Sequence, residues 1–136
     1  MNSSLFQIIV FLTLCVVPGG GSLHAQSYEC SQPAQEREAI IREAEKNRYT
    51  TRRVEFVGHR YTGDQVLRRT LKNGLQEGDL FTRRNLVRNL RNLSRVKQLY
   101  PVNMRDVELS LNRPDQTIDM TICLRERKTT RQKRGG

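Results

Sequence analysis

Few side chains in this sequence have the chemistry that catalysis or metal binding requires. The 136 residues contain two histidines, His24 and His59, and His59 stands in an expected turn with no cysteine or carboxylate cluster near it. Metal sites need ligands at defined spacings, and a phosphate-binding loop needs its glycines to be followed by Lys and then Ser or Thr. Gly74 and Gly78 are not followed by such residues. The sequence therefore predicts a protein that is not an enzyme and that needs no cofactor or metal.

Cys30 and Cys123 are the residues with the clearest potential for covalent chemistry. The third cysteine, Cys15, lies in an apolar N-terminal run, and removal of that run as a leader would leave an even pair. In an oxidising compartment this pair can form a disulfide, which would close a long loop and add about 4 kcal/mol of stability. Such a bridge would hold the N-terminal segment near the uncovered face of the expected sheet. Two unrelated free thiols are the alternative.

The N-terminal run itself predicts export. Residues 1–26 contain no Lys, Arg, Asp or Glu, and the apolar stretch 5–17 is followed by Pro18 and three glycines. This stretch is shorter than the about 20 apolar residues of a membrane-spanning helix and has the length of a signal-peptide core. We expect residues 1–26 to be a signal peptide, with an uncleaved anchor as the alternative.

Arginines repeat at helical spacing in the segment 83–95, roughly opposite a stripe of leucines. The formal net charge of the chain is +10. This face is either a solvated helix surface or a contact for an acidic partner or an anionic membrane surface. The basic, apolar-free residues 128–136 are expected to form a disordered tail that can lie on the same kind of surface. The candidate basic surface consists of Arg84, Arg88, Arg91 and Arg95.

Hydrophobic periodicity predicts the elements that position these side chains. In three segments apolar residues alternate with polar ones, as expected of strands with one buried face. These segments are residues 53–57, 107–111 and 118–124. Two helices are predicted between the first and second strands. One begins at Thr62, because Thr62 and Gln65 have the spacing of a capping box, and the other is capped by Thr82. A polar helical segment, residues 27–50, precedes the first strand.

The order strand, helix, helix, strand, strand predicts an α+β domain in which two helices cover one face of a three-stranded mixed sheet. Four short motifs in this order resemble the POTRA domain, the polypeptide-transport-associated module of BamA-like outer-membrane assembly proteins. These motifs are F-x-G-H with Phe56 and Gly58, G-D-x-F with Gly78 and Phe81, the leucines of the second helix, and a closing strand that ends in Glu126-Arg127. The resemblance implies one β-α-α-β-β domain over residues 51–127, with the extra N-terminal helix before it.

The resemblance also implies a function, since edges of these modules accept an extra strand from partner or client chains. We therefore expect an exported module, in the periplasm or at the outer membrane, that binds envelope or outer-membrane proteins during their assembly or transport. The candidate edge consists of Val107, Glu108, Leu109, Ser110 and Leu111. A basic nucleic-acid-binding domain is the first alternative, although the leader and the lack of aromatic residues on the basic helix argue against it. A secreted structural protein without a specific client is the second.

Overall fold

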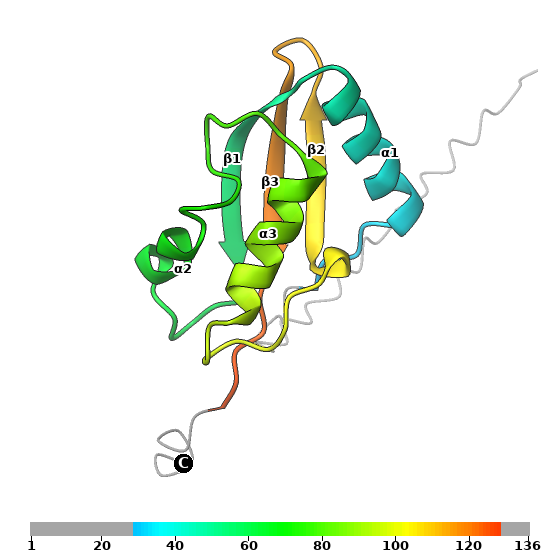
Figure 1. Cartoon of the computed structure of the whole chain (residues 1–136). Coiled ribbons are helices and arrows are strands. Elements are labelled where there is room, and N and C mark those ends of the chain that lie inside the picture. Colours follow the sequence, from blue (N-terminus) through cyan, green and yellow to red (C-terminus); the bar gives the residue numbers. More distant parts are fainter. Residues whose placement is uncertain (1–28, 129–136) are drawn as a thin grey trace, which may run out of the picture.

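Three strands form a mixed sheet at the centre of the computed structural model, which describes residues 29–128 (Figure 1). The strands are β1 (Thr50–Val57), β2 (Val107–Asn112) and β3 (Thr117–Cys123). Their order across the sheet is β1-β3-β2, with β3 parallel to β1 and antiparallel to β2. The helices α2 (Asp64–Thr70) and α3 (Arg83–Ser94) connect β1 to β2, so the predicted β-α-α-β-β order and the mixed sheet are confirmed.

The predicted signal peptide, residues 1–26, and all but the first residue of the predicted tail lie outside the described residues. Within residues 29–128, no helix is both long and apolar enough to cross a membrane.

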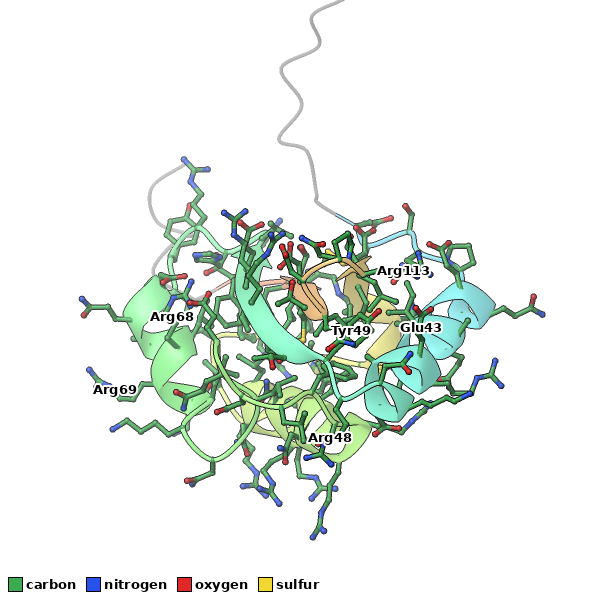
Figure 2. The ribbon with its side chains drawn as sticks, turned by 90° about the horizontal axis from the view of Figure 1, so that it is seen from above. Glu43, Arg48, Tyr49, Arg68, Arg69 and Arg113 are labelled. Atoms are coloured by element: carbon green, nitrogen blue, oxygen red, sulfur yellow. A yellow bond between two sulfur atoms is a disulfide. The ribbon has the colours of Figure 1, made fainter. Side chains whose placement is uncertain are left out.

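Alternating apolar side chains give the sheet one buried face, as the sequence predicts. They are Val54 and Phe56 from β1, Val107 and Leu109 from β2, and Ile118, Met120 and Ile122 from β3. Helix α3 covers this face and contributes its own buried stripe of Leu86, Leu90 and Leu93. Helix α2 flanks the β1 side of the sheet, and Figure 2 shows both helices on the same side of it. No helix of the described part of the chain covers the opposite face.

Helix α1 (Ala34–Lys46) lies beside β2 and completes the core (Figure 1). Its apolar face is narrow, but Ile41 and Ala44 on that face are both fully buried. Burial of a side chain such as isoleucine stabilises a fold by about 1.5 to 3 kcal/mol, so α1 is held by tertiary packing rather than by its own propensity.

The two predicted helix starts have different outcomes. Thr82 caps α3, where its side chain accepts a hydrogen bond from a backbone N–H of the first turn. The capping box predicted at Thr62 is wrong, because α2 begins two residues later, with Gly63 at its N-cap and no capping side chain. The reason is that the backbone N–H of Thr62 already donates a hydrogen bond to the Glu126 carboxylate. Glu126 lies 64 residues away in the sequence, so the local spacing does not indicate this contact.

The Glu126 carboxylate organises the turn before α2. It accepts hydrogen bonds from the backbone N–H groups of Arg60 (2.9 Å), Tyr61 (2.9 Å) and Thr62 (2.6 Å). Partial burial raises the pKa of Glu126, but the hydrogen bonds that these N–H groups donate outweigh burial and hold the pKa below its ordinary value. The stability that the carboxylate contributes is therefore present above the ordinary glutamate pKa of about 4.3 and is lost as the pH falls through the lower folded-state pKa.

Replacing Glu126 by glutamine should lower the free energy of unfolding by about 1 to 2 kcal/mol at pH 7, since an amide accepts these hydrogen bonds less strongly than a carboxylate. At pH 3 the difference between the two proteins should shrink, because protonation removes the same charge from the native side chain. Urea denaturation of both proteins at the two pH values measures this difference in the free energy of unfolding. Glu55→Gln is the control, as Glu55 makes only an exposed ion pair with Arg53. An equal loss at both pH values would contradict the assignment.

Candidate functional site

The start of the outer edge of β1 is closed by the loop between α2 and α3. The N–H of Thr51 donates to the carbonyl of Asp79 (2.8 Å), and the carbonyl of Thr51 accepts from the N–H of Gly78 (2.7 Å). The N–H of Phe81 donates to the carbonyl of Tyr49 (2.8 Å). The G-D-x-F motif thus pairs with β1 through its backbone and leaves no room for a further strand there.

Side chains extend this closure to Val54. The Val54 N–H donates to the carboxylate of Glu77 (3.1 Å), and the Val54 carbonyl accepts from the guanidinium of Arg68 (3.2 Å). The N–H and C=O groups of an edge strand are what a partner strand needs, so β1 is blocked at the positions where these groups are already used.

The outer edge of β2 is different, because only part of it is covered. Alternate residues of an antiparallel strand direct their backbone groups away from the paired neighbour, and here these are Val107, Leu109 and Leu111. The Leu109 N–H and carbonyl are both bound by the side chain of Gln32, and the Val107 carbonyl accepts from Arg37. Among residues 29–128, the outward N–H and carbonyl of Leu111 have no hydrogen-bond partner.

A groove of about 350 Å³ runs between α1 and this edge of β2. Its lining is mixed: Ala39, Ile40, Leu109 and Leu111 contribute apolar side chains, and Glu36, Glu43, Ser110 and Arg113 contribute polar ones. The uncovered backbone groups of Leu111 therefore stand beside a hollow that is apolar in part. Backbone pairing together with an apolar pocket is the combination that proteins use to bind an extended peptide at a sheet edge.

Glu43 and Arg113 form the charged rim of the groove. The Arg113 guanidinium donates two hydrogen bonds to the Glu43 carboxylate, at 2.7 and 3.0 Å, and Figure 2 shows the two side chains side by side near Tyr49. These hydrogen bonds from Arg113 lower the pKa of Glu43 below its ordinary value. The pair joins α1 to the β2–β3 turn and so fixes one end of the groove.

The disulfide lies at the other end of β2. The structure contains a bond between Cys30 and Cys123, with their Cα atoms 5.8 Å apart, which is one of the two alternatives that the sequence leaves open. Cys123 follows the core residue Ile122 and therefore points to the opposite face of the sheet. The bond holds the start of the described chain at this face, close to the end of the sheet from which β2 begins.

The candidate basic surface lies on α3. Arg84, Arg91 and Arg95 are exposed and Arg88 is half-buried, on the side of α3 that faces away from the sheet. None of the four forms an ion pair with another described residue, whereas the neighbouring Arg83 pairs with Glu38 of α1. Contact of this surface with an acidic partner or an anionic membrane stays a prediction.

The remaining motif residues are structural. Gly58 and Gly78 have φ values of 83° and 92°, in the left-handed region that favours glycine, and Phe56 and Phe81 are buried. His59 packs its ring edge-on against Phe56, at 6.4 Å between centroids. No cluster of three or more His, Cys, Asp or Glu side chains in the described part of the chain is placed to hold a metal ion.

Two residues at the site and one buried polar residue of the core were missed from the sequence. Gln32 and Arg37 contact a strand 70 or more positions away, and nothing in their local spacing indicates it. Asn89 is fully buried among the leucines of α3. A polar residue within an apolar helical stripe is a signal that it has a specific partner, although the sequence does not name that partner.

Among known protein families, the one described as POTRA, surface antigen variable number repeat, matches residues 49–127, which is more than half of the chain. None of the curated proteins compared with the chain matches it.

Solved structures that are similar to this one include two from Omp85. POTRA1-3 of the periplasmic domain of Omp85 from Anabaena has 17% sequence identity and a TM-score of 0.46, over 62% of this chain and 36% of that one. The N-terminal domain of Omp85 from the thermophilic cyanobacterium Thermosynechococcus elongatus has 18% identity and a TM-score of 0.46, over 60% and 35%. The chain thus spans little more than a third of the length of these structures.

Proposed function

The chain belongs to the POTRA family, and on that premise we propose that it is a non-catalytic protein-binding module that takes up an extended segment of a partner along the outer edge of β2. The observation that carries the proposal is the open N–H and carbonyl of Leu111 beside the groove between α1 and β2. The closure of β1 by Gly78, Asp79 and Phe81 supports the choice of β2, since a partner strand needs free backbone groups.

The groove also indicates the chemistry of the partner. Leu109 and Leu111 line the groove with apolar side chains, whereas the alternate residues of β2, Glu108, Ser110 and Asn112, are polar. An added strand would present alternate side chains to these two environments. A segment in which apolar and polar residues alternate fits best, and strands of outer-membrane proteins have this pattern. We therefore place envelope or outer-membrane proteins, during their assembly or transport, among the partners.

An exported location is part of the proposal. The apolar run before residue 18 has the length of a signal-peptide core, and the Cys30–Cys123 disulfide suits an oxidising compartment. The periplasm or the surface of the outer membrane is the compartment in which such a module would meet strands before they are inserted.

Leu111→Pro should weaken the binding of an extended peptide by about tenfold or more. Proline removes the outward N–H of Leu111, but that N–H takes no part in the pairing of β2 with β3, so the sheet itself is kept. The probe is a synthetic peptide of about 10 residues that alternates valine or leucine with threonine or serine, the length and pattern of a barrel strand. Fluorescence anisotropy with labelled peptide measures the affinity, in oxidised and in reduced protein.

Leu111→Ala is the matched control, because it shortens the same side chain and keeps the N–H. It should change the affinity no more than about threefold, since part of the apolar lining is lost but the backbone pair is kept. Equal losses in the alanine and proline variants, or no binding of the peptide in either redox state, would contradict strand addition at β2.

A further inference from the structure

Residues 30–33, which we term the arm, lie at the β2 edge directly before α1, and Gln32 of the arm makes the contacts of a neighbouring strand. The side-chain amide of Gln32 donates from Nε2 to the Leu109 carbonyl and accepts at Oε1 from the Leu109 N–H, both at 2.9 Å. A paired residue on an adjacent strand would make the same two hydrogen bonds to Leu109. Gln32 therefore occupies one position of the edge to which a partner strand would bind.

Two further contacts hold the arm on this edge. The N–H of Ser31 donates to the carboxylate of Glu108 (2.8 Å), and the guanidinium of Arg37 donates to the carbonyls of Gln32 (3.0 Å) and Val107 (3.4 Å). Arg37 is only 4% exposed, and these carbonyls are the partners of its buried charge. With those of Gln32, these contacts use the Val107 carbonyl and both backbone groups of Leu109, and they stop short of Leu111.

The disulfide fixes the arm because Cys30 is two residues from Gln32. Partly exposed hydrogen bonds of this kind contribute little net stability, so alone they would hold the arm weakly against a competing strand. A covalent bond to Cys123 keeps Gln32 close to Leu109 and makes its binding intramolecular, with a correspondingly high effective concentration. At its other end the arm continues into α1, which Ile41 and Ala44 anchor in the core.

We infer that the arm is a built-in occupant of the β2 edge and that the Cys30–Cys123 disulfide is its latch. Opening the disulfide frees Leu109, so that a partner strand extends its pairing from Leu111 to Leu109. This inference rests on the proposed function, because the arm would regulate the β2 edge at which the partner is proposed to bind. Release stays local, because the anchoring residues of α1 remain buried.

A dithiol supplies the chemistry that opens the latch. Its first thiolate attacks one sulfur of the disulfide, which expels the other as a thiolate, and its second thiolate then breaks the mixed disulfide. Cys30 and Cys123 gain two electrons and two protons in total, and the dithiol becomes a disulfide. A hollow of about 300 Å³ adjoins the two cysteines and gives a dithiol access to their bond.

Amide hydrogen exchange of the full chain, labelled with ¹⁵N, tests the latch without any partner. Reduction with dithiothreitol should speed exchange of the Leu109 N–H by about tenfold or more, since loss of one protecting hydrogen bond of about 1.4 kcal/mol has that effect. The Thr51 N–H, which Asp79 holds on the β1 edge, is the internal control and should keep its protection. Unchanged protection of the Leu109 N–H after reduction would overturn the inference, whether or not the alternating peptide binds.

A second variant keeps the test valid if reduction weakens the whole fold. Gln32→Ala in the oxidised chain should also speed exchange at Leu109 and should strengthen binding of the alternating peptide by about threefold to tenfold. Gln35→Ala is the matched control, because Gln35 is exposed on α1 and holds no group of β2. One outcome would refute the latch and leave the proposed function standing. In that outcome, peptide binding depends on Leu111 but has the same affinity in oxidised protein, in reduced protein and in Gln32→Ala.

Discussion

Replacing Asn89 by leucine should lower the free energy of unfolding by about 3 to 5 kcal/mol, because it leaves two buried backbone groups without partners. Asn89 is fully buried, and its side chain accepts from the Leu75 N–H (2.7 Å) and donates to the Leu75 carbonyl (2.8 Å). The amide thus pairs the loop after α2 with the middle of α3. Leucine has a similar volume but can make neither hydrogen bond.

The packing around Asn89 allows little relaxation. A Cβ placed on Gly74 would lie 1.7 Å from the Asn89 Oδ1, so the loop backbone comes directly against the amide. Guanidinium titration followed by circular dichroism measures the loss. Asn92→Ala is the control, because Asn92 makes one half-buried hydrogen bond, to the Thr70 carbonyl (3.1 Å), and should cost about 1 kcal/mol. A loss from Asn89→Leu no larger than that of the control would show that the Leu75 pair is dispensable.

Gly58→Ala should destabilise the fold by about 2 to 5 kcal/mol, the sum of a backbone penalty and a collision. The backbone of Gly58 has φ 83°, and a Cβ there would lie 2.3 Å from the carbonyl oxygen of Leu124. That oxygen belongs to the backbone, which is itself fixed by a hydrogen bond from the Leu124 N–H to the Val57 carbonyl (2.8 Å). The collision therefore cannot be relieved by turning a side chain.

Gly78→Ala separates the two contributions to this loss. Gly78 has a similar φ of 92°, but a Cβ there meets no other atom within 4 Å, so only the backbone penalty of about 1 to 2 kcal/mol applies. Urea denaturation of both variants gives the comparison. Equal losses at the two positions would mean that the approach of Leu124 to Gly58 has no energetic consequence.

The sequence predicts those parts of the fold that depend on local periodicity. Alternation at Val54 and Phe56 and in the β2–β3 hairpin is correct because each strand buries one face, and the leucines of α3 are correct for the same reason. The cap at Thr82 is also local and is confirmed. The capping box at Thr62 is wrong because a distant carboxylate, Glu126, binds the backbone that the box would have used.

Which backbone groups of the candidate edge are free depends on contacts between distant segments, and local sequence patterns do not reveal these contacts. The segment 107–111 is an edge strand, but the sequence does not show that Gln32 covers Leu109 and leaves Leu111 open. That arrangement results from where the Cys30–Cys123 bond places the arm. The closure of β1 by the G-D-x-F motif is likewise a pairing between distant segments. Sequence patterns therefore locate the candidate edge but do not show which of its positions are free.

Nuclear magnetic resonance of the reduced full chain with the alternating peptide tests strand addition at β2 most directly. Strand addition predicts cross-strand Hα–Hα contacts between the peptide and β2, together with new protection of the Leu109 and Leu111 amides and no change at Thr51. Contacts that instead map to the arginines of α3 or to β1, with Leu111 still exchanging freely, would contradict it.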